Sequence, residues 1–326
     1  MPEMSYVEAI SLALLEEMER DENVFVLGED VGAYGGAFGV TAGLQEKFGF
    51  YRVLDTPISE SLIVGAAVGA AMMGMRPVAE MQFADFISCA FDQLANQAGS
   101  LRYRYGGRQG CPIVVRAPSG GAVRGGPYHS QNPEGWFCHC PGLKVVVPAM
   151  ADDAKGLLKA AIRDDDPVIY FENKYLYRRI KGEVPEGDHV TPLGKARIHR
   201  EGADISIIAY GSAVHHCIAA AQSLEQEGVD AEVMDLRTLV PLDEEALLAT
   251  VRKTGHAVIV HEDWRRGGFG AEIAAILAEE AMDCLSGPII RVASHDAPIP
   301  FSASLEDAHL PSADRVIEAA RRALQS

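Results

Sequence analysis

The segment 55–60 carries the first side chain that could take part in chemistry. It has the sequence DTPISE and lies between a short apolar run and a glycine- and alanine-rich stretch with the composition of a packed helix. The proline favours a turn, so Glu60 is expected to open that helix. A carboxylate at a helix N-terminus is stabilised by the positive end of the helix dipole. Glu60 is therefore either a capping charge or a group that binds a ligand.

Two more side chains could act on a ligand. His129 follows a glycine-rich segment, 119–128, with the composition of a flexible loop, and loops carry many catalytic residues. With an unperturbed pKa near about 6.5, a histidine can give or take a proton at neutral pH. Phe86 could stack on a planar ring. A surface histidine and a core phenylalanine are the simpler alternatives.

Familiar nucleotide and metal patterns are incomplete in this chain. The stretch at Gly268 and Gly270 has isoleucine at the third glycine position of a dinucleotide turn, and no Gly-x-x-x-x-Gly-Lys-Ser/Thr occurs. These absences argue against a Rossmann dehydrogenase and exclude P-loop chemistry. Residues 138–140, with the sequence CHC, look like part of a metal site, but structural zinc usually takes four ligands. No second cluster follows, so an ordinary buried segment is favoured.

The elements that must position these residues alternate between strands and helices. Strands are expected at 24–27, 52–54, 77–81, 113–116, 144–147 and 167–171, with helices at 60–74, 86–104 and 151–163. Beyond 200, strands are expected at 205–210, 231–236, 257–261 and 289–292, with helices at 213–227, 243–253 and 270–283. This alternation indicates largely parallel sheets with helices on both faces. Helix 60–74 carries Gly65 and Gly69 on one face, which would let another backbone approach closely.

The length of 326 residues is comfortable for two domains. Residues 172–200 show no sustained periodicity, which is typical of a connecting segment. The predicted fold is α/β, with two doubly wound domains. We expect the first at 1–185, a linker at 186–200, and a smaller second domain at 201–326.

The charge narrows the range of partners. The formal net charge is −17, which would repel nucleic acid and anionic membranes, because binding to either needs clustered lysine and arginine. The longest apolar run, 61–75, is shorter than the roughly 20 residues of a membrane helix. The first residues lack a basic stretch followed by an apolar one, and the six cysteines contain no Cys-x-x-Cys. We therefore expect a cytoplasmic protein.

Several motifs together resemble one family. They are 55–60 with the glycine and alanine stretch 65–71, RPVAE at 76–80, RYRYGG at 102–107, HSQ at 129–131, PGLKVV at 141–146, DAKGL at 153–157, EVMDLRT at 232–238 and KTG at 253–255. In this order they resemble the β subunits of the E1 component of 2-oxo acid dehydrogenases, across essentially the whole chain. The resemblance implies a transketolase-like pyrimidine-binding domain followed by a transketolase C-terminal domain.

The resemblance also implies roles for the residues singled out above. Glu60 would accept a hydrogen bond from N1′ of the aminopyrimidine of thiamine diphosphate, and such a charge-assisted bond is worth roughly 1.5–3 kcal/mol. Phe86 would stack on the pyrimidine, and Glu29 and Gln82 would line the pocket. His129 would lie near the substrate and help transfer the acyl group to a lipoyl arm.

A structural potassium ion is a further implication of the resemblance. Relatives hold this ion at positions that correspond to Ile113, Ala161, Asp164 and Asp166, largely through carbonyl oxygens. Three successive acids at 164–166 are compatible with a cation. A solvated helix end is an equally good explanation of the same acids.

One missing motif predicts a partner. Single-chain relatives hold Mg²⁺ and the diphosphate with a Gly-Asp-Gly motif, which this sequence lacks. Because these groups need hard oxygen ligands, the resemblance implies an E1 α subunit that supplies them, in an α₂β₂ heterotetramer. A lipoyl-bearing E2 acyltransferase would be the second partner.

The substrate stays open among 2-oxo acids. Residues 127–134 and 137–142 look most like branched-chain enzymes, and pyruvate is the alternative. Acetoin dehydrogenases use the same β architecture. The chain could also be a β-like subunit that serves only in assembly, or a self-contained transketolase-like enzyme. The presence of Glu60, Phe86 and His129 weighs against a role in assembly alone, and the missing diphosphate motif weighs against a self-contained enzyme.

Overall fold

The computed structural model describes residues 2–325 and divides into two compact units. The first unit runs to Ser119 and resumes over Trp136–Leu193, whereas the second comprises Gly120–Gly135 and the residues from Gly194 onward. The second unit therefore includes a segment that the sequence assigned to the first domain. The expected linker, 186–200, ends in a strand, β9 (Arg197–Arg200), that belongs to the second unit's sheet.

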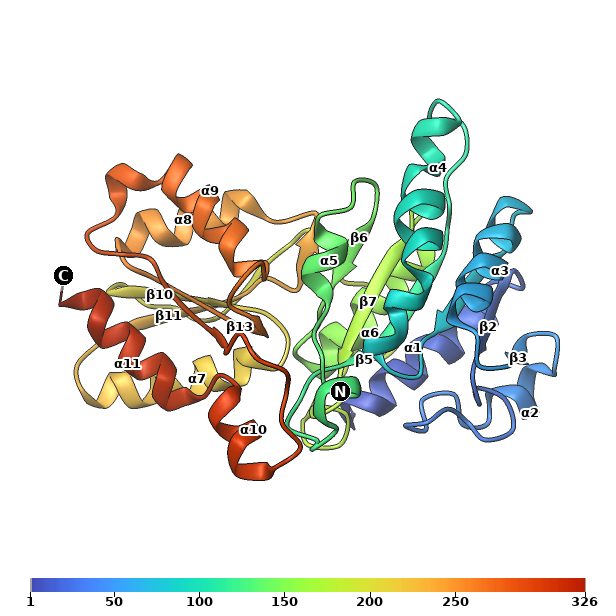
Figure 1. Cartoon of the computed structure of the whole chain (residues 1–326), viewed down its shortest axis with the longest axis horizontal. Coiled ribbons are helices and arrows are strands. Elements are labelled where there is room, and N and C mark those ends of the chain that lie inside the picture. The colour runs from blue at the N-terminus through green and yellow to red at the C-terminus, as the bar shows by residue number, and fades with distance from the viewer. Residues whose placement is uncertain (1, 326) are drawn as a thin grey trace. The chain divides into compact units, whose positions relative to one another are not determined.

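The first unit is built on a parallel sheet (Figure 1). Its strands follow the order β3-β2-β4-β5-β7-β6, and each neighbouring pair is parallel. They are β2 (Val24–Gly28), β3 (Val53–Asp55), β4 (Arg76–Glu80), β5 (Val114–Ser119), β6 (Lys144–Val146) and β7 (Val168–Asn173). The longer strands are buried along nearly their whole length, as expected for a sheet covered on both faces.

The helices of the first unit include α1 (Tyr6–Arg20), α2 (Leu44–Phe48), α3 (Glu60–Met72), α4 (Gly99–Arg104), α5 (Glu134–Cys138) and α6 (Ala151–Arg163), with α5 beginning inside the second unit's segment. Helices α1 and α6 pack against each other. A small antiparallel pair joins β1 (Glu3–Ser5) to β8 (Lys181–Glu183), and β8 lies in the stretch 172–200 that the sequence predicted to be a connecting segment.

The stretch expected to be a helix at 86–104 is helical throughout, but it is not one regular α-helix. The chain instead forms a 3₁₀ helix over Ala84–Ala90, a π-helical stretch over Gln93–Ala98 and then α4. Short 3₁₀ and π segments change the direction in which side chains project, and π segments occur often at functional sites. Phe86 lies in the 3₁₀ portion.

The second unit contains a mixed sheet with the order β14-β13-β10-β11-β9. The pairs of β10 (Ile205–Ala209), β11 (Ala231–Asp235), β13 (Ala257–Trp264) and β14 (Ile290–Ser294) are parallel. Strand β9 pairs antiparallel to β11, so the sheet is parallel-rich rather than wholly parallel. A short strand, β12 (Thr238–Val240), follows β11.

The second unit's helices are α7 (Ala213–Gln226), α8 (Glu244–Thr254), α9 (Gly270–Glu280), α10 (Ala303–His309) and α11 (Ala313–Leu324), and η3 (Gly126–Tyr128) and η4 (Met282–Cys284) are short 3₁₀ helices. Helices α10 and α11 were not among the elements expected from the sequence. Within residues 2–325, no helix is long and apolar enough to cross a membrane.

A carboxylate-edged candidate active site

The candidate site lies where neighbouring parallel strands of the first unit end. Strand β2 pairs with both β3 and β4, and Gly28 is in register with Asp55 and Glu80. The residues that follow these three strands therefore meet at one edge of the sheet, which is where parallel α/β sheets bind ligands. Glu29 follows β2, Glu60 opens the helix after β3, and Gln82 follows β4.

Glu29 is a buried carboxylate with an unused acceptor. Its side chain is 7% exposed, and its Oε1 atom has no hydrogen-bond partner among the described residues. Burial, together with the nearby charges of Glu60 and Asp30, raises the pKa of Glu29 above its ordinary value. A buried acceptor without a partner matches a ligand that offers N–H donors, as the amino group and protonated ring nitrogen of an aminopyrimidine do.

Glu60 is the first residue of α3, and the preceding Ser59 makes no side-chain capping bond. The charge of Glu60 contributes to the raised pKa of Glu29, so the two carboxylates lie close enough to interact. The structure thus brings Glu29 and Glu60 together as an acidic pair. Such a pair favours a ligand that carries a positive charge or N–H donors.

Side-chain contacts fix the turn that carries Glu29. Asp55 Oδ1 accepts a hydrogen bond from the backbone N–H of Gly32 at 2.6 Å, and a Cβ atom at Gly32 would lie 2.3 Å from the same carboxylate. Gln82 Nε2 donates to Asp30 Oδ2 at 3.3 Å. These contacts tie the turn to the ends of β3 and β4, so Gln82 supports the turn beside Glu29.

Phe86 belongs to an aromatic cluster next to this edge. Its ring is perpendicular to that of Phe83 at 6.2 Å between centroids, and Phe83 meets Phe38 edge-to-face at 5.5 Å. Phe86 is half-buried. A ring held by neighbouring rings can orient a flat ligand at little cost in conformational freedom.

His129 lies in the second unit, whereas Glu29, Glu60, Gln82 and Phe86 share the first. The segment around His129 has the composition of a flexible loop, but hydrogen bonds to side chains of α10 fix it in place. Arg124 Nη1 donates to Glu306 Oε2 at 2.6 Å and to Asp307 Oδ1 at 2.7 Å. A Cβ atom at Gly126 would lie 2.3 Å from the ring of Phe301. The segment therefore has defined contacts within its own unit.

The residues expected around a potassium ion already have partners. The carbonyl oxygen of Ile113 accepts from Val168 N at 3.0 Å, and that of Ala161 accepts from Asp164 N at 3.3 Å. Lys144 donates to Asp164 Oδ2 at 2.6 Å, and Arg102 pairs with Asp166. No group of three or more His, Cys, Asp or Glu side chains among residues 2–325 could hold a metal ion. The ion stays a prediction that depends on carbonyl oxygens.

Two buried charge clusters have no signal in the sequence. Arg116 in β5 is fully buried and binds Glu172 of β7 through Nε at 2.6 Å, and it also pairs with Glu80 of β4. Within the second unit, Glu134 and Asp263 form a buried acidic pair. Burial raises the pKa of Asp263 to about 7, and burial with the nearby Asp263 raises that of Glu134. These partners are far apart in the chain, so only the fold reveals them.

Comparisons with known proteins identify the family. The transketolase pyrimidine-binding domain matches residues 2–179, and the transketolase C-terminal domain matches residues 194–316. The chain is 54% identical to the 2-oxoisovalerate dehydrogenase subunit β of Bacillus subtilis, covering 99% of each chain. It is 47% identical to the pyruvate dehydrogenase E1 component subunit β of Staphylococcus epidermidis, covering 100% of each.

A solved structure agrees with this assignment. The inactive β4 tetramer of a split-gene transketolase matches with a TM-score of 0.81 at 26% identity, covering 99% of this chain and 98% of that one. The full-length identities and the two domain matches lead to a single family. The chain belongs to the β subunits of 2-oxo acid dehydrogenase E1 components, which join a transketolase pyrimidine-binding domain to a transketolase C-terminal domain.

Proposed function

We propose that this chain is the β subunit of a thiamine diphosphate-dependent E1 enzyme that oxidatively decarboxylates a branched-chain 2-oxo acid and passes the acyl group to lipoyl-E2. The observation that carries the proposal is the Glu29 and Glu60 pair at the carboxyl ends of parallel strands, with a buried acceptor that lacks a partner. When bound, thiamine diphosphate supplies the group that accepts the electrons released with carbon dioxide.

The chain's own residues would bind and orient the pyrimidine half of this cofactor. Glu60 accepts a hydrogen bond from the ring nitrogen N1′ and stabilises its protonated form. Glu29 and Gln82 line the pocket, and Phe86 holds the plane of the ring. Their shared position next to β2, β3 and β4 supports these roles.

His129 would supply a proton during transfer of the acyl group to the lipoyl arm. A histidine suits this role because its ordinary pKa lies near neutral pH. The hydrogen bonds from Arg124 to Glu306 and Asp307 support the role, since they fix the segment that carries His129.

The diphosphate and Mg²⁺ would be held by an α subunit in an α₂β₂ assembly. The relatives at 54% and 47% identity are named as β subunits, and the sequence has no Gly-Asp-Gly motif. Helix α3 and the turn before it offer an apolar surface to a partner, since Ile58 and Leu62 are 81% and 55% exposed. A Cβ atom added at Gly69 would meet nothing within 4 Å, so another chain could approach this helix closely.

The substrate preference is supported by the order of the identities. The 54% identity to the 2-oxoisovalerate dehydrogenase subunit exceeds the 47% identity to the pyruvate dehydrogenase subunit. Pyruvate is therefore the second candidate. A cytoplasmic location completes the proposal, because no two cysteines among residues 2–325 form a disulfide bond, which suits a reducing compartment. A potassium ion bound by the carbonyl oxygens of Ile113, Ala161 and Asp164, with Asp166 nearby, would stabilise the turn.

Reconstitution tests the proposal. The chain is mixed with its α subunit, thiamine diphosphate and Mg²⁺, and carbon dioxide release is measured with 2-oxoisovalerate and with pyruvate. We expect turnover only when both chains are present, with a higher kcat/KM for 2-oxoisovalerate. Turnover of the isolated chain would refute the shared cofactor site, and a preference for pyruvate would refute the substrate assignment alone.

A further inference from the structure

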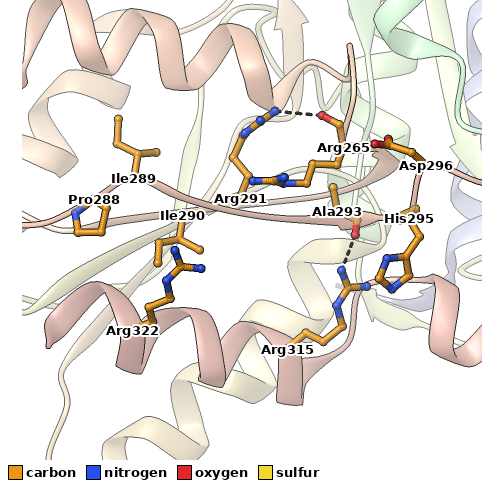
Figure 2. Close-up of a pocket in the computed structure, with 11 residues that line it drawn as sticks. Arg265, Pro288, Ile289, Ile290, Arg291, Ala293, His295, Asp296, Arg315 and Arg322 are labelled. Carbon is orange, nitrogen blue, oxygen red and sulfur yellow. Dashed lines mark hydrogen bonds between the residues drawn. The ribbon is translucent and has the colours of Figure 1, made fainter. Parts of the chain in front are cut away.

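An unassigned cavity of about 470 Å³ lies at the edge strand β14 of the second unit. Figure 2 shows Arg265 and Arg291 close together beside the strand, with Arg315 and Arg322 rising toward it from α11. Asp296 is the one acidic side chain in the lining. The volume falls in the range of small-molecule sites, roughly 300–1,000 Å³.

The charge of this cavity contrasts with the rest of the chain. The sequence has 46 acids against 29 bases, and several arginines elsewhere pair with acids, as Arg163 does with Glu17 and Arg321 with Glu227. Among the described residues, Arg265, Arg291 and Arg315 form no salt bridge with any carboxylate, and Asp296 pairs instead with Arg266. Three positive charges around one cavity therefore lack a salt-bridge partner within the described part of the chain.

Neutral groups fix the direction of two of these arginines. Arg315 Nη2 donates to the carbonyl oxygen of Ala293 at 2.6 Å, and its Nη1 donates to that of Leu310 at 2.8 Å. Arg291 Nη1 donates to the carbonyl oxygen of Arg265 at 3.0 Å. Carbonyl oxygens position a guanidinium group without neutralising it, so the cavity keeps its positive potential.

Two histidines near the cavity have lowered pKa values, chiefly because they are buried. Burial, the neighbouring His295 and the charge of Arg315 lower the pKa of His309. Burial and the charge of Arg291 lower the pKa of His261 to about 4. Burial is the largest cause in both cases, and the charge of a lining arginine acts in the same direction, although Glu306 and Glu262 partly oppose it at His309.

We propose that this cavity binds a small organic phosphate. The guanidinium groups of Arg265 and Arg291 suit phosphate oxygens, which accept several charge-assisted hydrogen bonds at once. Pro288, Ile289 and Ile290 form an apolar part of the lining, which suits a carbon body attached to the phosphate. The alternative is that the arginine charges bind no ligand and only prevent the edge strand β14 from pairing with a strand of another sheet.

Phenyl phosphate is the probe, because it joins a dianion to an apolar ring. Its binding to the full chain is measured by isothermal titration calorimetry, in a buffer of low ionic strength, beside the neutral analogue benzyl alcohol. Arg265→Gln and Arg291→Gln each remove one lining charge. Arg321→Gln is the matched control, since Arg321 is on α11 next to Arg322 but lies outside the cavity lining.

We expect saturable binding of phenyl phosphate, no comparable binding of benzyl alcohol, and a tenfold or greater loss of affinity in Arg265→Gln and Arg291→Gln but not in Arg321→Gln. Arg265→Lys should recover part of the affinity. Absence of saturable binding to the parent chain, or an equal loss of affinity in the Arg321→Gln control, would overturn the proposal. The arginines would then be assigned the alternative role of preventing pairing at the edge strand β14. Thermal unfolding of each variant establishes that it is folded. The assay involves neither thiamine diphosphate nor the α subunit, so its outcome is independent of the proposed function.

Discussion

The buried pair of Glu134 and Asp263 gives a quantitative prediction about stability and pH. Asp263 is 7% exposed, and burial raises its pKa from an ordinary 3.8 to about 7. The folded chain therefore binds a proton there that the unfolded chain releases above pH 3.8. The free energy of unfolding therefore falls as the pH rises from 3.8, and above about pH 7 this loss reaches its full value.

The size of this penalty follows from the same values. The difference between 3.8 and about 7 corresponds to about 4 kcal/mol at about 1.4 kcal/mol per pH unit. Relaxation and water entry reduce such penalties, so we expect about half of it to be measurable. Asp263→Asn removes the ionisable group and keeps an oxygen that can accept from Trp264 N. It should gain about 2 kcal/mol of stability, relative to the parent chain, between about pH 4.5 and pH 8.

Urea unfolding, followed by tryptophan fluorescence at both pH values, checks this prediction. Trp264 is next to the substitution, and the chain has two tryptophans. Asp283→Asn, at an exposed position, is the matched control and should show no such gain. The reasoning fails if Asp263→Asn is no more stable relative to the parent chain at pH 8 than at pH 4.5.

Three substitutions test the candidate site and its supports. Glu60→Gln should lower turnover of the α₂β₂ enzyme by roughly 100-fold or more, with assembly unchanged by size-exclusion chromatography; full turnover would remove Glu60 from its role. Glu306→Ala should speed hydrogen exchange of 120–135, because Arg124 loses a buried partner, whereas Glu306→Gln should do so less; equal exchange in both variants would contradict this. Arg116→Met should cost about 3–5 kcal/mol of unfolding free energy, because it leaves Glu80 and Glu172 buried without a counter-charge. Urea unfolding measures this, and a loss below about 1 kcal/mol would argue against a stabilising role for the buried arginine.

The sequence predicted the strands well because buried parallel strands are short, continuous apolar runs. The runs expected at 24–27 and 205–210 became β2 (Val24–Gly28) and β10 (Ile205–Ala209) with shifts of a single residue. The helical stretch at 86–104 was found, but its change of helix type was not, because hydrophobic spacing does not separate an α-helix from consecutive 3₁₀ and π turns. Those turns are stabilised by tertiary packing, which leaves no local signal.

The site was only partly predictable. Glu60 could be found, because a proline turn before a helix is visible in the sequence, and the resemblance supplied Glu29. The buried acceptor on Glu29 and its coupling to Glu60 depend on burial, which composition does not reveal. The assignment of 120–135 to the second unit depends on bonds between residues about 180 positions apart, such as Arg124 with Glu306.

The path of the chain through its two units limits how it can be divided. The backbone leaves the first unit after Ser119, passes through the second over Gly120–Gly135 and returns at Trp136. A fragment that began at Gly194 would lack Gly121, whose N–H binds Glu262, and Arg124, which binds Glu306. Glu306, which is buried, would lose the guanidinium of Arg124, and Glu262 would lose the N–H of Gly121. Cleavage between the units would therefore not yield a C-terminal fragment that folds alone. Gene fusions or insertions should avoid the segment 120–135.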